Sequence, residues 1–135
     1  TAQAVCNLYP QVHLLHGTGS LYWAGGMRYT WAKALESAAD YYLLLNDDTL
    51  LQPDAVVRLL ESAALHKHSV IIGATCDAHT GEASYGGWRL NSRLFWKSSR
   101  VTVTEQPQAC DFGNANIMLV PATVVERVGI LSHLY

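Results

Sequence analysis

Apolar and polar positions along the first half of the chain form blocks that predict helices and strands in turn. Apolar residues recur at helical spacing over 1–9, over 26–39 and again after Pro53, a residue suited to the first turn of a helix. Short, continuous apolar runs at 12–16, 41–45 and 70–74 predict strands between these helices. This order of elements predicts an α/β domain whose parallel strands are joined by crossover helices.

The second half of the chain has a different pattern. Residues 77–82 predict a turn, and short strands are expected at 83–85, 93–96 and 101–105. Residues 116–120 predict a buried strand, after which Pro121 opens a last helix that Gly129 ends. No internal repeat, linker or low-complexity segment interrupts the chain, so residues 1–135 are interpreted as one domain.

The composition favours a piece of a larger domain. Half of the 135 residues are hydrophobic and only 15% are charged, which suits strands buried on both faces or a segment that packs against more protein. An open α/β sheet normally places its first strand at the centre, whereas here a helix comes first. We therefore expect a domain truncated at both ends.

Charge and cysteine content narrow the class of protein. With a net charge of −2 and a pI of about 6.2, the sequence offers no basic patch for nucleic acid. No apolar run is long enough for a membrane span, and no signal peptide is visible at the start. Cys6, Cys76 and Cys110 form neither a metal pair nor a disulfide framework, so a cytoplasmic location is expected.

The candidate chemistry begins with Asn46-Asp47-Asp48-Thr49, which follows the apolar run at 41–45. Carboxylates at the carboxyl end of a strand lie where open α/β sheets bind ligands. They are hard oxygen ligands, suited to a divalent cation that carries phosphates. In this interpretation one carboxylate binds the metal and the other orients a ribose hydroxyl or a metal-bound water. The same residue types also favour an ordinary turn.

Two glycine-containing segments follow the predicted strand at 12–16. Gly17-Thr18-Gly19 lies where a dinucleotide-binding loop would lie, but Tyr22 occupies the position of that motif's third glycine. Gly25 and Gly26 permit close approach of a ligand to the backbone. Arg28, in the first turn of the predicted helix, is unfavourable for the helix dipole and is either an anion contact or a surface arginine.

Further candidates lie in the second half. Trp88, after Gly86-Gly87, either stacks on a sugar face or packs in the core. Residues 111–114 form a turn or a polar loop that faces a pocket, and the six histidines give no convincing metal set.

Taken together, several segments resemble the family 2 inverting glycosyltransferases, near the bacterial rhamnosyltransferase-like members. They occur in the family's order and cover nearly the whole chain. The matching segments are 21–28, 40–49, 53–55, 80–82, 85–89, 113–114, 117–121 and 128–129. The resemblance implies the GT-A (Rossmann-like) fold, a three-layer sandwich with a mainly parallel central sheet. The chain would then be the middle of a nucleotide-sugar-binding glycosyltransferase domain.

The resemblance also implies roles for individual residues. Asp48 matches the metal-binding acid of the family's Asp-x-Asp motif, with Mg²⁺ or Mn²⁺ bridging the donor diphosphate. Asn46 stands where that motif usually has its first aspartate, and Asp47 adds a neighbouring carboxylate. The segment with Gly25, Gly26 and Arg28 matches the loop that lines the nucleotide pocket, where many members carry asparagine at the position of Arg28. Gly87, Trp88 and Asn114 match regions near the donor sugar and the acceptor.

The implied reaction transfers a sugar from a nucleotide-diphosphate sugar to a hydroxyl of a glycan or lipid-linked acceptor, with inversion. The family's catalytic base lies after the last matching segment, so we expect it beyond Tyr135 and expect this chain alone to be inactive. The parent protein is expected in the cytoplasm or at the inner face of the membrane. Uncovered sheet edges would favour self-association. Two alternatives are a non-catalytic nucleotide-sugar-binding or scaffold module and a dinucleotide-binding oxidoreductase.

Overall fold

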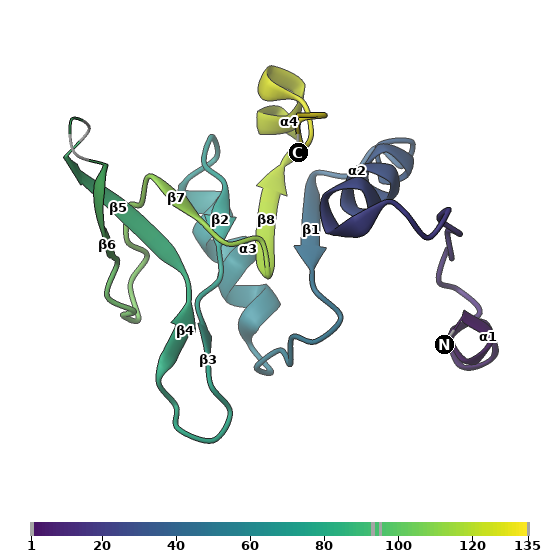
Figure 1. Cartoon of the computed structure of the whole chain (residues 1–135), viewed down its shortest axis with the longest axis horizontal. Helices are drawn as coiled ribbons and strands as arrows, with labels where there is room; N and C mark the ends of the chain where they lie inside the picture. The colour runs from purple at the N-terminus through teal and green to yellow at the C-terminus, as the bar shows by residue number, and fades with distance from the viewer. Residues whose placement is uncertain (1, 93, 95, 135) are drawn as a thin grey trace. The chain divides into compact units, whose positions relative to one another are not determined.

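The computed structural model describes residues 2–92, 94 and 96–134 (Figure 1). The chain divides into two compact units. One comprises residues 1–38 and 130–135, and the other comprises residues 39–129.

The first unit is helical. It contains α1 (Ala2–Leu8), as predicted, and α2 (Tyr22–Ala34), which begins earlier and ends earlier than the predicted helix. The strand predicted at 12–16 is wrong: residues 9–21 form turns and coil. No described segment pairs with this apolar run, and a strand exists only when a neighbour accepts and donates its hydrogen bonds.

The second unit is built on a sheet with strand order β1-β8-β2, formed by β1 (Tyr41–Leu45), β8 (Ile117–Pro121) and β2 (Ile71–Ile72). Both pairings are antiparallel, with Leu43 and Ile71 on either side of Leu119. The expected mainly parallel sheet is therefore not what the described residues show. The reason is that the last strand in the sequence inserts between two strands joined by α3 (Ala55–Leu65). Since β1 and β2 both oppose β8, they run in the same direction, as the helix–strand alternation predicts.

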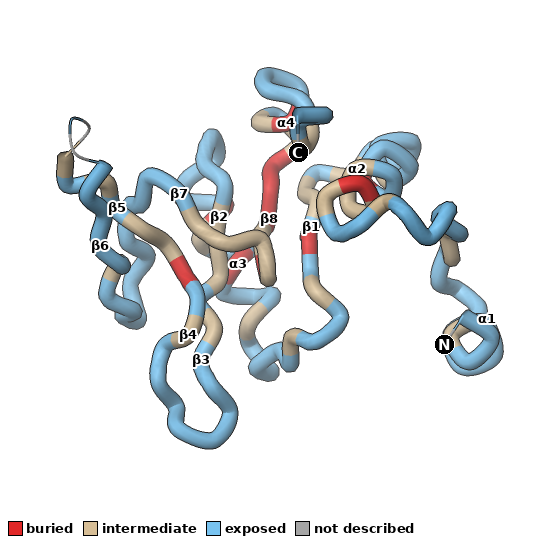
Figure 2. The backbone as a smooth tube through the Cα atoms, in the orientation of Figure 1, coloured by how far each residue is buried: buried red, intermediate tan, exposed pale blue. Residues whose placement is uncertain are grey.

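The core lies between α3 and the middle of this sheet (Figure 2). Leu59 and Ala63 of α3 pack with Ile117 and Leu119 of β8, and Tyr41 and Ile71 border the cluster. Val120, whose side chain leaves the opposite face of β8, is buried as well. A central strand buried on both faces explains the continuous apolar run at 117–120.

Two smaller antiparallel sheets follow β2. β3 (Thr75–Cys76) and β4 (Ala83–Tyr85) form a hairpin around the predicted turn at 77–82. The other sheet has the order β6-β5-β7, with β6 (Lys97–Arg100), β5 (Gly87–Ser92) and β7 (Phe112–Gly113).

Strand predictions in this region are partly wrong. Leu94 and Trp96 lie in a turn, while Arg93 and Phe95, which belong to the predicted strand at 93–96, lie outside the described residues. The strand predicted at 101–105 is not formed, because pairing with β5 ends at Val101, whose N–H donates to Gly87 O. The polar segment at 97–100 forms the strand instead.

The last helix, α4 (Ala122–Val128), confirms its prediction. Gly129 ends it with a φ of 76°, a left-handed conformation that favours glycine, and its N–H donates to Val125 O. No helix in the described part of the chain combines the length and the apolar character that crossing a bilayer requires.

Candidate functional site

The acidic turn follows directly on β1. The strand ends at Leu45, residues 47 and 48 form a turn, and the Thr49 N–H donates to Asn46 O at 3.3 Å. Asp47 and Asp48 are both exposed. The sequence prediction of adjacent carboxylates at a strand's carboxyl end is therefore confirmed.

Asn46, between the strand and the acids, is held by the neighbouring strand. Its N–H donates to Asn116 O at 3.0 Å, and its side-chain Nδ2 donates to Asn116 Oδ1 at 3.3 Å. Both residues are partly buried. This double link ties the start of the acidic turn to the residue that precedes β8.

The donor set fits a divalent cation that brings further ligands with it. Within the described residues, neither Asp47 nor Asp48 has a hydrogen-bonding or ion-pair partner, so all four carboxylate oxygens are open to a ligand. That same part of the chain contains no cluster of three or more His, Cys, Asp or Glu side chains with the geometry of a metal site. Carboxylate oxygens are ligands that Mg²⁺ accepts together with waters and substrate phosphates, so Asp47 and Asp48 are the residues of this turn that could hold a divalent cation.

The predicted nucleotide segment lies inside a helix rather than in a loop. Gly25, Gly26 and Arg28 all belong to α2, and Gly25 is buried beside Leu21. Arg28 Nη1 donates to Ser132 O at 2.8 Å, which ties the helix to the C-terminal segment of the same unit. Sequence reasoning missed this bond because it joins positions 104 residues apart.

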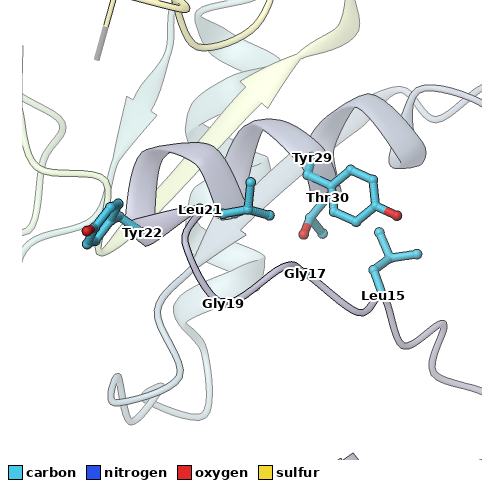
Figure 3. A pocket seen from close by; sticks show the side chains of 8 residues that line it. Leu15, Gly17, Gly19, Leu21, Tyr22, Tyr29 and Thr30 are labelled. Carbon is cyan, nitrogen blue, oxygen red and sulfur yellow. The ribbon is translucent and has the colours of Figure 1, made fainter.

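An open hollow of about 340 Å³ lies beside α2 (Figure 3). Its wall combines the glycine-rich loop with one side of the helix, including Tyr29 and Thr30. Gly26 borders it, whereas Gly25 and Arg28 do not. The full lining is Leu15, Gly17, Gly19, Leu21, Tyr22, Gly26, Tyr29 and Thr30.

The same loop bears on the dinucleotide alternative. That motif requires a strand immediately before Gly17, and residues 9–21, all of which are described, contain none. No observation in the structure favours a dinucleotide-binding oxidoreductase.

Gly87, Trp88 and Asn114 lie in or next to the β6-β5-β7 sheet. Trp88 is half-buried, with Arg100 over its ring at 5.5 Å and Phe112 stacked beside it at 6.4 Å between ring centroids. Gly87 packs against Cys110, where an added Cβ would lie 2.7 Å from the cysteine Cβ. Asn114 follows β7 and has no hydrogen-bonding partner among the described residues.

One carboxyl group in the second unit has a clearly shifted pKa. Asp77 Oδ1 accepts hydrogen bonds from the N–H groups of His79 and Thr80, each at 2.8 Å. The backbone bond from Thr80, followed by that from His79, lowers the pKa of Asp77 below its ordinary value of 3.8. This aspartate shapes the β3–β4 turn and lies outside the candidate metal site.

Asn116 is the residue of the acidic site that sequence reasoning missed. A polar residue at the start of an otherwise apolar strand was the available signal. Its significance depends on the antiparallel pairing of β1 with β8, which local patterns do not report.

Comparison with protein-family models, with curated proteins and with solved structures found no match for this chain.

Proposed function

We propose that this chain is part of a metal-dependent glycosyltransferase of the GT-A type. The parent protein would transfer a sugar from a nucleotide-diphosphate sugar to a hydroxyl of a glycan or lipid-linked acceptor, with inversion. The observation that carries the proposal is the Asn46-Asp47-Asp48 turn. Two exposed carboxylates, which have no partners among the described residues, follow strand β1. Asn46, which precedes them, is hydrogen-bonded to Asn116.

In this proposal Asp48 binds Mg²⁺ or Mn²⁺, and Asp47 supplies a second carboxylate for the ion or its waters. The bound ion would stabilise the negative charge on the leaving diphosphate. Asn46 adds no charge, and its link to Asn116 fixes where the turn begins. This link favours metal binding, because the free energy needed to order a mobile loop would lower the affinity of a site built on it.

The arrangement of elements supports a GT-A-type domain. β1 and β2 run in the same direction and are joined through α3, so they form the crossover unit typical of α/β proteins. The acidic turn follows the carboxyl end of the first of these strands, where such folds bind ligands.

The family resemblance assigns further residues to the donor and acceptor. Gly25, Gly26 and Arg28 of α2 are assigned to the nucleotide, and Gly26 borders the hollow beside this helix. Gly87, Trp88 and Asn114 are assigned to the sugar and acceptor. The three cysteines are free and exposed, which fits a reducing, cytoplasmic compartment.

Calorimetry with UDP-, GDP- and dTDP-sugars in the presence of Mn²⁺ tests the proposal on the parent protein and on its Asp48→Ala variant. We expect binding to require the metal and to weaken at least about tenfold in Asp48→Ala, a loss typical of a charge-assisted contact. Glu61→Gln, which removes an exposed carboxylate from α3, is the matched control. Equal affinity in wild type and Asp48→Ala would defeat the assignment.

Two measurements on the chain itself complete the test. Paramagnetic broadening by Mn²⁺ should appear first at the amides of residues 46–49 and should disappear in Asp48→Ala. We expect that the chain alone does not turn over any nucleotide sugar, since the resemblance assigns the catalytic base to none of its residues. Turnover by these 135 residues would overturn that part of the proposal.

Asn46 favours one second candidate, a nucleotide-sugar-binding module without chemistry. An amide at this position removes the negative charge of the motif's first aspartate, which Asp47 replaces only at the neighbouring position. The Asn46→Asp substitution in the parent protein restores this charge and discriminates between the transferase and the binding module. A large gain in turnover would favour a weakened enzyme. If the variant shows no turnover, as expected of a protein without chemistry, the binding module is favoured.

A further inference from the structure

Two aromatic rings are stacked across the β6-β5-β7 sheet. The Trp88 and Phe112 rings are parallel to within 3°, with 6.4 Å between their centroids. In the register of the sheet, Trp88 pairs with Phe112 of β7 on one side and with Arg100 of β6 on the other. The Arg100 guanidinium lies over the indole at 5.5 Å. Trp88 therefore lies between two neighbours, and Phe112 ends the row on the outer strand of this sheet.

Of the two rings, Phe112 is the more open to solvent. It is 48% exposed, whereas Trp88 is partly buried. Stacking against the indole favours one orientation of the phenyl ring, because aromatic pairs attract each other in specific geometries. Phe112, rather than Trp88, is thus the residue of this row that offers an oriented aromatic surface to a ligand.

The backbone around Phe112 is fixed on both sides. The Asp111 N–H donates to Trp88 O at 2.8 Å, and Asp111 Oδ2 accepts a second backbone N–H of β5 at 2.8 Å. After the phenylalanine, a Cβ added to Gly113 would lie 2.7 Å from Ile72 Cδ1, so the chain passes close to the central sheet. A ligand that contacts a ring on such a fixed backbone has little ordering of the protein to offset.

The same segment leads to the acidic turn. Asn116, four residues after Phe112, accepts the hydrogen bonds from Asn46 that anchor this turn. Four residues span at most about 14 Å, so the Cα of Phe112 lies within that distance of the Asn116 Cα. Asn114, between them, is partly buried and carries an amide that donates and accepts hydrogen bonds. An aromatic ring and an amide therefore precede the residue that anchors the paired carboxylates.

We propose that Phe112 is the residue on which a hexopyranose ring stacks. The C–H groups on one face of such a ring pack on an aromatic surface, and its hydroxyls need polar partners such as the Asn114 amide. In this arrangement Trp88 orients the phenyl ring and does not itself contact the sugar. The choice of a sugar rests on the proposed transferase function. The ring belongs to the donor or to the acceptor, and both present the same chemistry.

Saturation-transfer NMR on the 135-residue chain tests the proposal without metal or nucleotide. The probes are methyl β-D-glucopyranoside, whose axial hydrogens at alternate carbons share one face, and methyl α-L-rhamnopyranoside. Phe112→Leu keeps an apolar side chain and removes the ring, whereas Phe112→Tyr keeps the ring. Tyr9→Leu, at a tyrosine that is 54% exposed, is the matched control. Circular dichroism checks that each variant folds.

We expect saturation to reach mainly the hydrogens of one sugar face. Phe112→Leu should bind the glycosides about three- to tenfold more weakly, the loss typical of one aromatic contact. Phe112→Tyr and Tyr9→Leu should bind as wild type. Absence of transfer to both glycosides would overturn the proposal, and so would equal affinity in wild type and Phe112→Leu.

Competition in the presence of Mn²⁺ decides the source of the ring. If UDP-, GDP- or dTDP-glucose displaces the glycoside and the corresponding nucleoside diphosphate does not, Phe112 contacts the donor sugar. If the glycoside and the nucleotide sugar bind together, Phe112 contacts the acceptor. Either result supports stacking on Phe112.

Failure of this inference is distinguishable from failure of the transferase proposal. Unchanged nucleotide-sugar affinity in Asp48→Ala, with loss of glycoside binding in Phe112→Leu, would defeat the transferase assignment and keep Phe112 as a sugar-binding residue. Metal-dependent nucleotide-sugar binding, with equal glycoside affinity in wild type and Phe112→Leu, would keep the transferase assignment and remove Phe112 from the site.

Discussion

The side-chain amide of Asn46 donates to the side-chain oxygen of Asn116 at 3.3 Å, although 70 residues separate them in the sequence. Together with the backbone bond from Asn46 N–H to Asn116 O, this contact joins the end of β1 to the start of β8. The acidic turn therefore begins at a residue fixed by the central sheet.

Asn116→Ala should lower the free energy of unfolding by about 1 kcal/mol, the typical loss for one partly buried hydrogen bond. It should also weaken Mn²⁺ binding at the turn, because the carboxylates lose their anchored starting point. Chemical denaturation and Mn²⁺ broadening measure the two effects. Asn114→Ala, which removes an amide without a described partner, is the control and should leave both unchanged. Equal effects of the two substitutions would remove Asn116 from the site.

Two Gly→Ala substitutions should change stability in opposite directions. At Gly87 the new Cβ would meet Cys110 Cβ at 2.7 Å and Sγ at 2.9 Å, so the variant should lose about 1–3 kcal/mol. At Gly26, inside α2, nothing lies within 4 Å of the new Cβ, so better helix propensity should add about 0.5–1 kcal/mol. Thermal unfolding decides both signs. A loss of nucleotide affinity in the more stable Gly26→Ala variant would support backbone approach at this position.

The β3–β4 turn should weaken in acid. Because the hydrogen bonds from Thr80 and His79 depress the pKa of Asp77 in the folded chain, its contribution to stability is present above the ordinary value of 3.8. That contribution is lost as pH falls below 3.8 and through the lower, folded-state pKa. Titration followed by NMR at Asp77 and at the amides of His79 and Thr80 measures the transition. Asp77→Asn keeps an acceptor oxygen and should abolish the pH dependence, so a transition that persists in Asp77→Asn would assign it to another group.

The outer edge of β1 is expected to mediate self-association. The backbone groups of Asn46 and Asp40 hydrogen-bond to Asn116 and Ala122, which flank β8. Since the backbone groups of successive residues in a strand point to opposite sides, those of Tyr41, Leu43 and Leu45 point away from β8. No described strand pairs with them. Leu43→Lys should reduce the apparent mass at high concentration, because a lysine at an edge opposes strand pairing. Light scattering measures this, with Leu50→Lys as the control at another exposed leucine. A monomeric wild type would contradict the expectation.

Local sequence signals predicted much of the fold. α3, α4 and β1 were recognisable because proline, glycine and apolar runs mark their ends within a few residues. β6 was not, since Lys97-Ser98-Ser99-Arg100 is exposed along its whole length and becomes a strand only by pairing with β5. The parallel sheet was expected because nothing near Ile117 reveals that this strand lies between β1 and β2.

In the candidate site, too, only the features that depend on neighbouring residues could be predicted from the sequence. The position of Asp47 and Asp48 after a strand was predictable from the apolar run at 41–45 and the turn residues that follow it. The structure confirms this position. The partner of Asn46, and the bond from Arg28 to the Ser132 carbonyl, depend on pairings between distant segments. Such partners become visible only when the tertiary arrangement is known.

The central place of β8 has a consequence for the order of folding. Both of its neighbours come earlier in the chain, and neither pairs with the other, so β1 and β2 remain without hydrogen-bonding partners until residues 117–121 have been synthesised. During translation, more than seventy residues would leave the ribosome after β1 before its partner strand appears. A nascent chain stalled before Ile117 would therefore expose two apolar strands at once, which makes it a substrate for chaperones and a seed for aggregation.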